Sequence, residues 1–414
     1  MTYPEAINWL YELRLFGSKL GLENPRQLAE HAGNPHDQLN IIHVAGTNGK
    51  GSVCAMLESI YRRAGYKTGL FTSPHLVSFR ERIQVNREIV PEVDVVRLTE
   101  CIQALLRRFP AGKLPTFFEV ITVMALEQFA REKCDVVLLE TGLGGRLDAT
   151  NIVTPIASVI TSIALDHQQH LGDTLAKIAT EKAGIIKPGT PVVSTVHQSE
   201  ISEVIRKVAA QNNAPLAFIE TEVDTCLVGK HQHQNAALAQ ATVQALWDIF
   251  PVDDKAIVDG LNNVHWAGRV QCYEKVNLRL LIDAAHNPAS GEALRDVLLE
   301  NFSGQRPTVL IGMLADKNWK SFLEIIAPIA KRVVCVPVSS ERTLAPSHLA
   351  EESRRHCAHV FEAKSLQEGL DTVKDDPFVV ITGSFYLAGE ALEAVGLADA
   401  VGERGLNEWT MSKL

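Results

Sequence analysis

One segment constrains the fold more than any other, and it consists of Gly46, Thr47, Asn48, Gly49, Lys50, Gly51 and Ser52. Apolar residues at 40–45 predict a buried strand before it, and residues 49–63 follow a helical pattern. Glycines at such a turn let backbone N–H groups converge on phosphate oxygens, and the helix N-terminus favours negative charge. Lys50 would then contact the β- and γ-phosphates, while the Ser52 hydroxyl would ligate Mg2+. Gly51, inserted between them, departs from the common pattern, and a glycine-rich turn without a ligand is the alternative.

Strand and helix patterns alternate on both sides of this turn. The first forty residues predict one helix and a loop. Further strands are expected at 67–72, 135–139, 157–161 and 191–195, separated by helices that include 116–133 and 173–183. Such alternation predicts an α/β domain with a largely parallel sheet.

The pattern restarts after residues 265–269. Four more strands are expected at 279–283, 308–312, 332–336 and 378–382, again with helices between them. This is typical of a smaller doubly wound, Rossmann-like domain. We therefore expect an α/β protein of two domains: residues 1–266, which contain the phosphate loop and its parallel sheet, and residues 270–414.

Composition narrows the classes of partner. The 40 Lys and Arg residues are outnumbered by 49 Asp and Glu residues, which gives a net charge of −9, and no basic block carries interleaved aromatics. We expect no nucleic-acid partner. The N-terminus has no long apolar run, so neither a signal peptide nor a membrane segment is expected. Seven scattered cysteines without zinc-ligand spacing suit a reducing compartment and predict a cytoplasmic protein.

Ten stretches share one resemblance: FGSKLGLE, HVAGTNGKGSV, FTSPHLVSFRERI, TFFEVIT, LETGLGGRLDATN, ITSIALDHQQHLG, EKAGIIK, HQHQNAALA, DAAHNP and TGSFYL. The GTNGKGS turn resembles the phosphate loop of the Mur ligase superfamily. Together the stretches resemble folylpolyglutamate synthase/dihydrofolate synthase over nearly the whole chain. The resemblance implies an ATP-dependent ligase with two Mg2+ ions, and we expect a monomer. It would join L-glutamate to dihydropteroate or to the terminal glutamate of a reduced folate through an acyl phosphate.

Polar residues near strand ends suggest where metal would bind. Glu140 follows an apolar strand, at the edge where open α/β sheets bind ligands, and nearby glycines allow close approach. The resemblance makes Ser73 and His167 further Mg2+ ligands and makes Lys182 a carbamylated lysine that helps to hold a metal. From the residues alone, Glu140 and His167 fit surface positions, Ser73 a turn before proline, and Lys182 a solvated helix end. Carbamylation needs a neutral amine, so the site would have to lower the pKa of Lys182.

Three segments resemble the family's pteroate-binding surface, namely Lys19-Leu20-Gly21, Thr116-Phe117-Phe118-Glu119 and Leu147-Asp148-Ala149. A flat pterin needs an aromatic wall and a few polar partners. Phe117 or Phe118 would supply the wall, with core packing as the alternative for either, and Asp148 would accept from the pterin amino groups. Lys19 stands where bifunctional relatives often carry an acidic residue, which favours folates over dihydropteroate.

Residues on the second-domain side would complete the nucleotide site. By resemblance, Asn235 contacts adenine and Asp283 binds nucleotide, through the ribose hydroxyls. Arg269 would bind phosphate across the cleft, and His286 would orient the acyl phosphate or the incoming glutamate, so that Lys50, Glu140, Lys182 and His286 are the expected catalytic residues. For Asn235 the alternative is a helix that packs between the domains, and for Arg269 it is a solvated position in the linker. For the other two it is a helix cap by Asp283 with His286 in the first turn. Ala284 replaces the family's usual glycine, so no positive φ is expected there.

Three other functions fit parts of this pattern. The nearest is a folylpolyglutamate synthase without dihydrofolate synthase activity. A cell-wall Mur ligase would need a UDP-binding domain before the phosphate loop, and only about 45 residues precede it. A nucleotide-binding regulator without ligase activity would have no need of Glu140, His167, Lys182 and Asp283 together.

Overall fold

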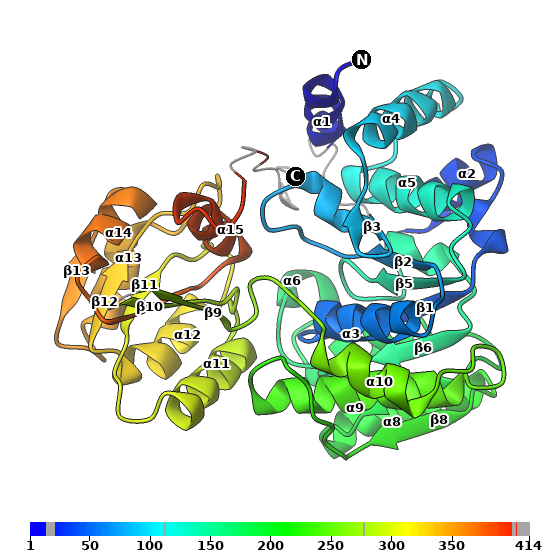
Figure 1. Ribbon diagram of the computed structural model, residues 1–414. Helices are drawn as coiled ribbons and strands as arrows, with labels where there is room; N and C mark the ends of the chain where they lie inside the picture. Colours follow the sequence, from blue (N-terminus) through cyan, green and yellow to red (C-terminus); the bar gives the residue numbers. More distant parts are fainter. Residues whose placement is uncertain (14–20, 111–112, 276–277, 400–402, 404–414) are drawn as a thin grey trace.

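The computed structural model describes residues 1–13, 21–110, 113–275, 278–399 and 403, and these form two lobes, each built on one sheet (Figure 1). The first sheet has eight strands in the order β4-β3-β2-β5-β1-β6-β7-β8. Their bounds are β1 Ile41–Ala45, β2 Thr68–Phe71, β3 Ile83–Val85, β4 Glu88–Ile89, β5 Val136–Glu140, β6 Ala157–Ile160, β7 Val192–Thr195 and β8 Leu216–Ile219. Strands β2, β5, β1, β6, β7 and β8 are mutually parallel, whereas β3 and β4 pair antiparallel. The predicted parallel α/β sheet is confirmed.

Helices cover both faces of this sheet. One face is covered by α3 Lys50–Arg63, α9 Lys230–Ala245 and α10 Asp254–Asn262. The other carries α1 Tyr3–Glu12, α2 Glu23–His31, α4 Glu92–Leu106, α5 Phe117–Arg131, α7 Leu175–Ala183 and α8 Ser199–Gln211. Short helical turns are η2 Pro35–Gln38, η3 Phe79–Arg82, η4 Ala149–Ile152 and α6 Gln168–Leu171. Apolar β1 is buried at all five positions, because β5 and β6 flank it and helices cover it.

The expectation of one helix in the first forty residues is wrong. Within the described part of this region the chain forms α1, α2 and the turn η2. Helix α1 begins with a capping box, in which the Thr2 side chain and Glu5 satisfy each other's backbone N–H groups. Helix α2 carries Pro25 in its first turn, where proline is tolerated because its missing N–H would have no intrahelical partner.

The second lobe has a six-stranded sheet in the order β13-β12-β11-β14-β10-β9. Its strands are β9 Gln271–Lys275, β10 Leu278–Ile282, β11 Thr308–Ile311, β12 Arg332–Cys335, β13 Val360–Glu362 and β14 Phe378–Thr382. Its helices are α11 Pro288–Asn301, α12 Trp319–Ile326, η5 Ala327–Ile329, α13 Pro346–Ser353, α14 Leu366–Val373 and α15 Phe385–Ala394. All pairs are parallel except β9 with β10, so the predicted Rossmann-like sheet is present with one added antiparallel edge strand.

Strand register brings the carboxyl ends of the central strands to one edge. Val44 of β1 pairs with Glu140 of β5, and Ala45 pairs with Ile160 of β6. The residues that follow these strands therefore gather where open parallel sheets bind ligands. The chain passes from α10 to β9 between the lobes (Figure 1). No helix among the described residues is long and apolar enough to cross a bilayer.

Candidate active site

The glycine-rich turn joins β1 to α3, as the sequence predicts. Gly49 has a φ of 89°, and a Cβ there would lie 2.6 Å from the Asn235 side-chain oxygen. Gly51 lies in the first turn of α3, where a Cβ would lie 2.8 Å from the indole of Trp266. The inserted glycine is thus explained by packing: the tryptophan occupies the space that a side chain would need.

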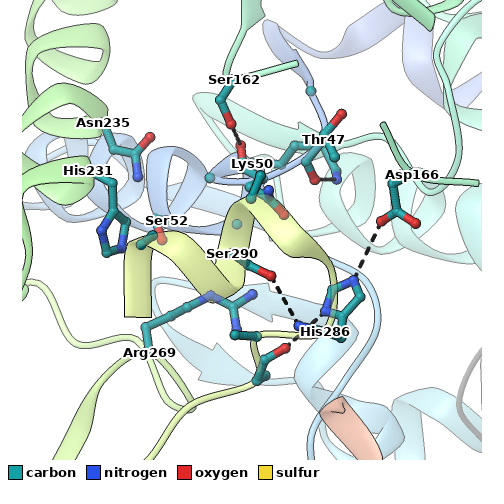
Figure 2. A pocket seen from close by; sticks show the side chains of 18 of the residues that line it. Thr47, Lys50, Ser52, Ser162, Asp166, His231, Asn235, Arg269, His286 and Ser290 are labelled. Atoms are coloured by element: carbon teal, nitrogen blue, oxygen red, sulfur yellow. Dashed lines mark hydrogen bonds and ion pairs between the residues drawn. The ribbon is translucent and has the colours of Figure 1, made fainter. Parts of the chain in front are cut away.

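A cavity of about 350 Å³ opens in front of this turn. Its walls include all seven residues of the turn and, from the second lobe, Asp283, His286 and Phe385. In Figure 2, Asn235 and His231 face the turn from one side, while Asp166 and His286 lie on the other. The cavity therefore brings together residues of both lobes at the carboxyl edge of the first sheet.

Ser73 and Glu140 meet at the ends of neighbouring strands and line this cavity. The Ser73 backbone N–H donates to Glu140 Oε2 over 3.1 Å. Burial raises the pKa of the Glu140 carboxyl, and the positive charge of Lys50 opposes the shift. The Ser73 hydroxyl oxygen is buried without a hydrogen-bond partner among the described residues. An unsatisfied hydroxyl beside a carboxylate offers the oxygen ligands that Mg2+ prefers, so the residues present fit such an ion.

Lys182 is buried near the end of α7, with 3% of its surface exposed. Its Nζ donates to the carbonyl oxygen of Gly46 over 2.6 Å, which places the amine against the glycine-rich turn. Burial, with a further contribution from Lys50, lowers its pKa to about 7. The solvated helix-end alternative is therefore wrong, and a substantial fraction of this amine is neutral near pH 7.

His167 neighbours an acidic residue to which sequence reasoning gave no role. Asp166 Oδ1 accepts from Lys317 Nζ over 2.8 Å, and Asp166 Oδ2 accepts from the Asn287 side-chain amide over 3.1 Å. Asp166 Oδ2 also lies 3.6 Å from His286 Nε2. Burial opposes ionisation of Asp166, but the hydrogen bond from His286 and the charge of Lys317 outweigh it and hold the pKa well below its usual value. Asp166 thus links the lobes through three side chains.

His167 itself adopts a left-handed conformation with a φ of 49°. Its Nε2 lies 3.0 Å from Lys317 Nζ, so the ring nitrogen accepts from the ammonium group. Burial, reinforced by Lys317, lowers the pKa of His167 to about 3. The ring is therefore neutral, as a metal-binding imidazole must be. Lys317 occupies the lone pair that the predicted metal role would use.

The predicted nucleotide residues of the second-domain side line the same cavity. Asn235 donates to Gln232 Oε1 over 3.0 Å, and Arg269 is half-buried with its guanidinium 4.9 Å from the centre of the Phe385 ring. Both carboxylate oxygens of Asp283 accept backbone N–H groups, from Val270 and from Ala285. Asp283 therefore fixes the start of the second lobe, and ribose binding would use its remaining lone pairs. Ala284 has no positive φ, as expected.

Those predicted acceptor residues that the structure describes lie outside the cavity lining. Thr116 and Glu119 form a capping box at the start of α5, and Asp148 is buried, accepting from the backbone of Leu143 and Thr150 and from the Thr150 hydroxyl. Phe117 belongs to the core, with Ala149 also buried and Leu147 half-buried. Phe118 approaches the cavity, since its ring covers Gly142. Gly21 is half-buried, whereas Lys19 and Leu20 lie outside the described residues.

Comparisons with known proteins agree with this geometry. Residues 44–222 match the Mur ligase middle domain, and residues 268–385 match the Mur ligase glutamate ligase domain. The fold and site thus define an ATP-dependent ligase of the Mur type. The dihydrofolate synthase/folylpolyglutamate synthase of Bacillus subtilis is 33% identical over 94% of this chain and 98% of its own length. The chain belongs to the folylpolyglutamate synthase/dihydrofolate synthase family.

Solved structures match over nearly the whole chain. Folylpolyglutamate synthase of Mycobacterium tuberculosis, complexed with ADP and AMPPCP, is 30% identical with a TM-score of 0.89, covering 95% of this chain and 99% of that one. Escherichia coli FolC in complex with DHPP and ADP is 32% identical with a TM-score of 0.83, covering 95% and 98%. Both of these similar proteins were solved with a bound nucleotide, which supports ATP binding by this chain.

Proposed function

We propose that this chain joins L-glutamate to a carboxylate of dihydropteroate, of a reduced folate, or of both, with conversion of ATP to ADP and phosphate. The observation that carries the proposal is the cavity in which the glycine-rich turn, the Ser73–Glu140 pair and the second lobe meet. A cavity built from two lobes suits a reaction whose activated intermediate must be kept from water.

The chemistry follows from the poor reactivity of a carboxylate. Its carbon accepts an amine only after one oxygen becomes a good leaving group. The acceptor oxygen attacks the γ-phosphorus of ATP, while Lys50 and the backbone N–H groups of the turn offset the charge on the transferred group. The neutral amine of L-glutamate then attacks the acyl carbon, and phosphate leaves as the amide forms. His286, at the boundary of the lobes, would orient the acyl phosphate or the incoming amino acid.

Two Mg2+ ions are part of the proposal. Ser52, Ser73 and Glu140 would hold one, and a carbamate on Lys182 would help to hold the second together with His167, whose ring nitrogen would first have to be released by Lys317 Nζ. Bound Mg2+ supplies positive charge at the phosphate oxygens. The buried amine of Lys182 supports carbamylation, because its lowered pKa leaves the nitrogen lone pair free to add to CO2 with loss of a proton. Carbon-13 NMR with labelled bicarbonate would detect the carbamate in the wild type, and Lys182→Met should lack the signal.

The proposed activity has two versions, which differ in whether dihydropteroate is accepted in addition to reduced folates. Relatives carry the names of both activities, folylpolyglutamate synthase in Lacticaseibacillus casei and dihydrofolate synthetase in Saccharomyces cerevisiae. Lys19 favours the version limited to folates. Dihydropteroate and tetrahydrofolate, offered separately with labelled glutamate and ATP, distinguish the two versions when products are resolved by mass.

Two variants test the site assignment. Lys50→Ala removes the cation beside the phosphates, and Glu140→Ala removes the carboxylate beside Ser73. Either change should abolish amide formation while leaving far-UV circular dichroism unchanged. Lys320→Ala is the control, because Lys320 lies on α12 and does not line the cavity. Product formation at the parent rate by either site variant would remove the assignment.

We also propose that the division between the lobes falls at residues 266–270, and that the enzyme acts as a monomer in the cytoplasm. All seven cysteines are free, which suits a reducing compartment. Sedimentation of the purified chain at micromolar concentration would test the monomer.

A further inference from the structure

Arg82 is fully buried and incompletely satisfied. It is the last residue of η3, its exposed fraction is 0%, and its Nε donates to His75 Nδ1 over 2.8 Å. Neither Nη1 nor Nη2 has a hydrogen-bond partner among the described residues. A guanidinium withdrawn from water normally has a carboxylate or carbonyl partner, because an unpaired buried charge destabilises the fold.

Neighbouring carboxylates are already engaged elsewhere. Burial lowers the pKa of Arg82 to about 10, and the groups that act against this shift are Tyr11, Glu81, Tyr386 and Glu140. Glu81 accepts from three consecutive backbone N–H groups at 76–78, and Glu140 accepts from Ser73. No ion pair of Arg82 occurs within the described part of the chain. The guanidinium stays charged at neutral pH, and no described residue supplies an anion to its terminal nitrogens.

The position of Arg82 indicates which anion this is. Its guanidinium lies over the ring of Phe117, 5.5 Å from the ring centre, at the start of α5. Glu140, which accepts from the Ser73 N–H, is close enough to raise the pKa of Arg82, and so is Tyr386 on α15 of the second lobe. Arg82 therefore lies between the start of α5, the segment predicted to bind the acceptor, and Glu140, the predicted metal-binding carboxylate. A substrate acid that runs from the start of α5 towards the γ-phosphate would pass the guanidinium.

We propose that Arg82 binds a carboxylate of the pteroate or folate acceptor, with Nη1 and Nη2 as the two donors of a planar fork. The inference rests on the proposed function and names a residue that holds its substrate. Arginine suits this role because the guanidinium matches a carboxylate with two parallel hydrogen bonds. The ligand-free chain covers Arg82 completely, so entry of the acid requires part of that cover to move aside.

Two acids share this chemistry, and they have different sources. Dihydropteroate carries one carboxylate, which is the group to be activated, whereas in a folate that group is an amide and the carboxylates lie on the glutamate tail. If Arg82 binds whichever carboxylate is to be activated, both acceptors depend on it. If it binds a tail carboxylate, only the folate does. Separate titrations of the two acceptors therefore identify the group.

The test compares Arg82→Met with the wild type. Loss of a charged, bidentate contact should raise the acceptor Kd about 10- to 100-fold in calorimetry, with the Kd for ADP unchanged. The KM for L-glutamate should also stay within threefold of the parent. Pteroate should bind the wild type more tightly than its carboxamide, and Arg82→Met should bind the two equally. Arg80→Met, in the same short helix but with its side chain partly exposed, is the control and should leave all three values unchanged.

Thermal melting separates binding from a structural role. Because Arg82 is buried without an anionic partner among the described residues, Arg82→Met should melt at or above the wild-type temperature, and it should lose the rise in Tm that the acceptor induces. A lowered Tm with an unchanged acceptor Kd would make Arg82 structural and overturn the inference. A raised KM for L-glutamate alone would assign the site to the amino acid and overturn it as well. Failure of the wild type to turn over any pterin acid would instead remove the proposed function.

Discussion

Replacing Asp166 with asparagine should loosen the contact between the two lobes. The carboxylate of Asp166 and the ammonium group of Lys317 are 2.8 Å apart, and their side chains are only 11% and 8% exposed. Coulomb attraction at that distance is about 6 kcal/mol with an effective dielectric constant of 20, before desolvation is subtracted. Removing one partner of a buried pair typically destabilises by about 3–5 kcal/mol. We expect about 3 kcal/mol for Asp166→Asn, because the amide keeps the shape and part of the hydrogen bonding.

A double-mutant cycle with Lys317→Met isolates the pair. We expect a coupling energy near 2 kcal/mol in urea denaturation, within the range of about 1.5–7 kcal/mol seen for close charge pairs. The matched control is Lys177 with Asp173, which has the same 2.8 Å distance but side chains 62% and 72% exposed. Its coupling should be much weaker, because solvent screens an exposed pair. Equal coupling in the two pairs would refute the argument from burial.

The stabilisation that Asp166 provides should decrease as the pH falls. The folded chain holds the pKa of Asp166 well below its usual value, so the folded state binds fewer protons there than the unfolded state. The stabilisation is therefore complete above the unfolded pKa of about 3.9 and is lost as the pH falls through the lower folded value. The stabilities of wild type and Asp166→Asn should converge in acid. A constant difference between pH 7 and pH 2 would contradict the assignment.

Gly49→Ala should weaken ADP binding at least about 10-fold in calorimetry, because the new Cβ would lie 2.6 Å from the side-chain oxygen of Asn235 at a φ of 89°. Gly65→Ala shares that backbone strain at a φ of 91° but meets open space, so it should leave ADP binding unchanged. Lys182→Met should flatten the stability–pH profile. Since burial lowers the pKa of Lys182 to about 7, wild-type stability should rise from there towards pH 10.5 by up to about 1.4 kcal/mol per pH unit. A wild-type profile as flat as that of the variant would mean that the amine is not desolvated.

The sequence predicts most of the first lobe because each strand there is short, apolar and followed by a polar or glycine-rich turn. The strand before the glycine-rich turn was expected at 40–45 and is observed at Ile41–Ala45. The Ser73–Glu140 contact also follows from sequence, because parallel strands align their carboxyl ends and both residues come at such ends. Pattern reasoning succeeds where local periodicity and sheet geometry determine the outcome.

Charge pairs between residues that are far apart in the sequence cannot be predicted from local sequence patterns. Asp166 and Lys317 are 151 positions apart, and each looks like a solvated loop residue until the lobes come together. From its residues alone Lys182 fits a solvated helix end for the same reason, since its helix pattern carries no sign of the glycine-rich turn that covers it. Arg82, in an alternating polar and charged stretch, gave no hint of complete burial. Each of these residues is buried by a segment distant in sequence.

The segment between the lobes shows how these features combine. Trp266 packs its indole against the first turn of α3 and under the guanidinium of Arg87, 4.9 Å from the ring centre. Val270 is fixed on the other side, because its backbone N–H donates to Asp283. Gly268 is fixed to the second lobe as well, because its carbonyl accepts from the Ala284 N–H and its own N–H donates to Gln271 Oε1, each over 3.0 Å. Any rotation of one lobe against the other would therefore fall between Trp266 and Gly268. Arg269 follows this link and lines the cavity, so a phosphate bound by it would act directly beside the bonds that allow the lobes to move.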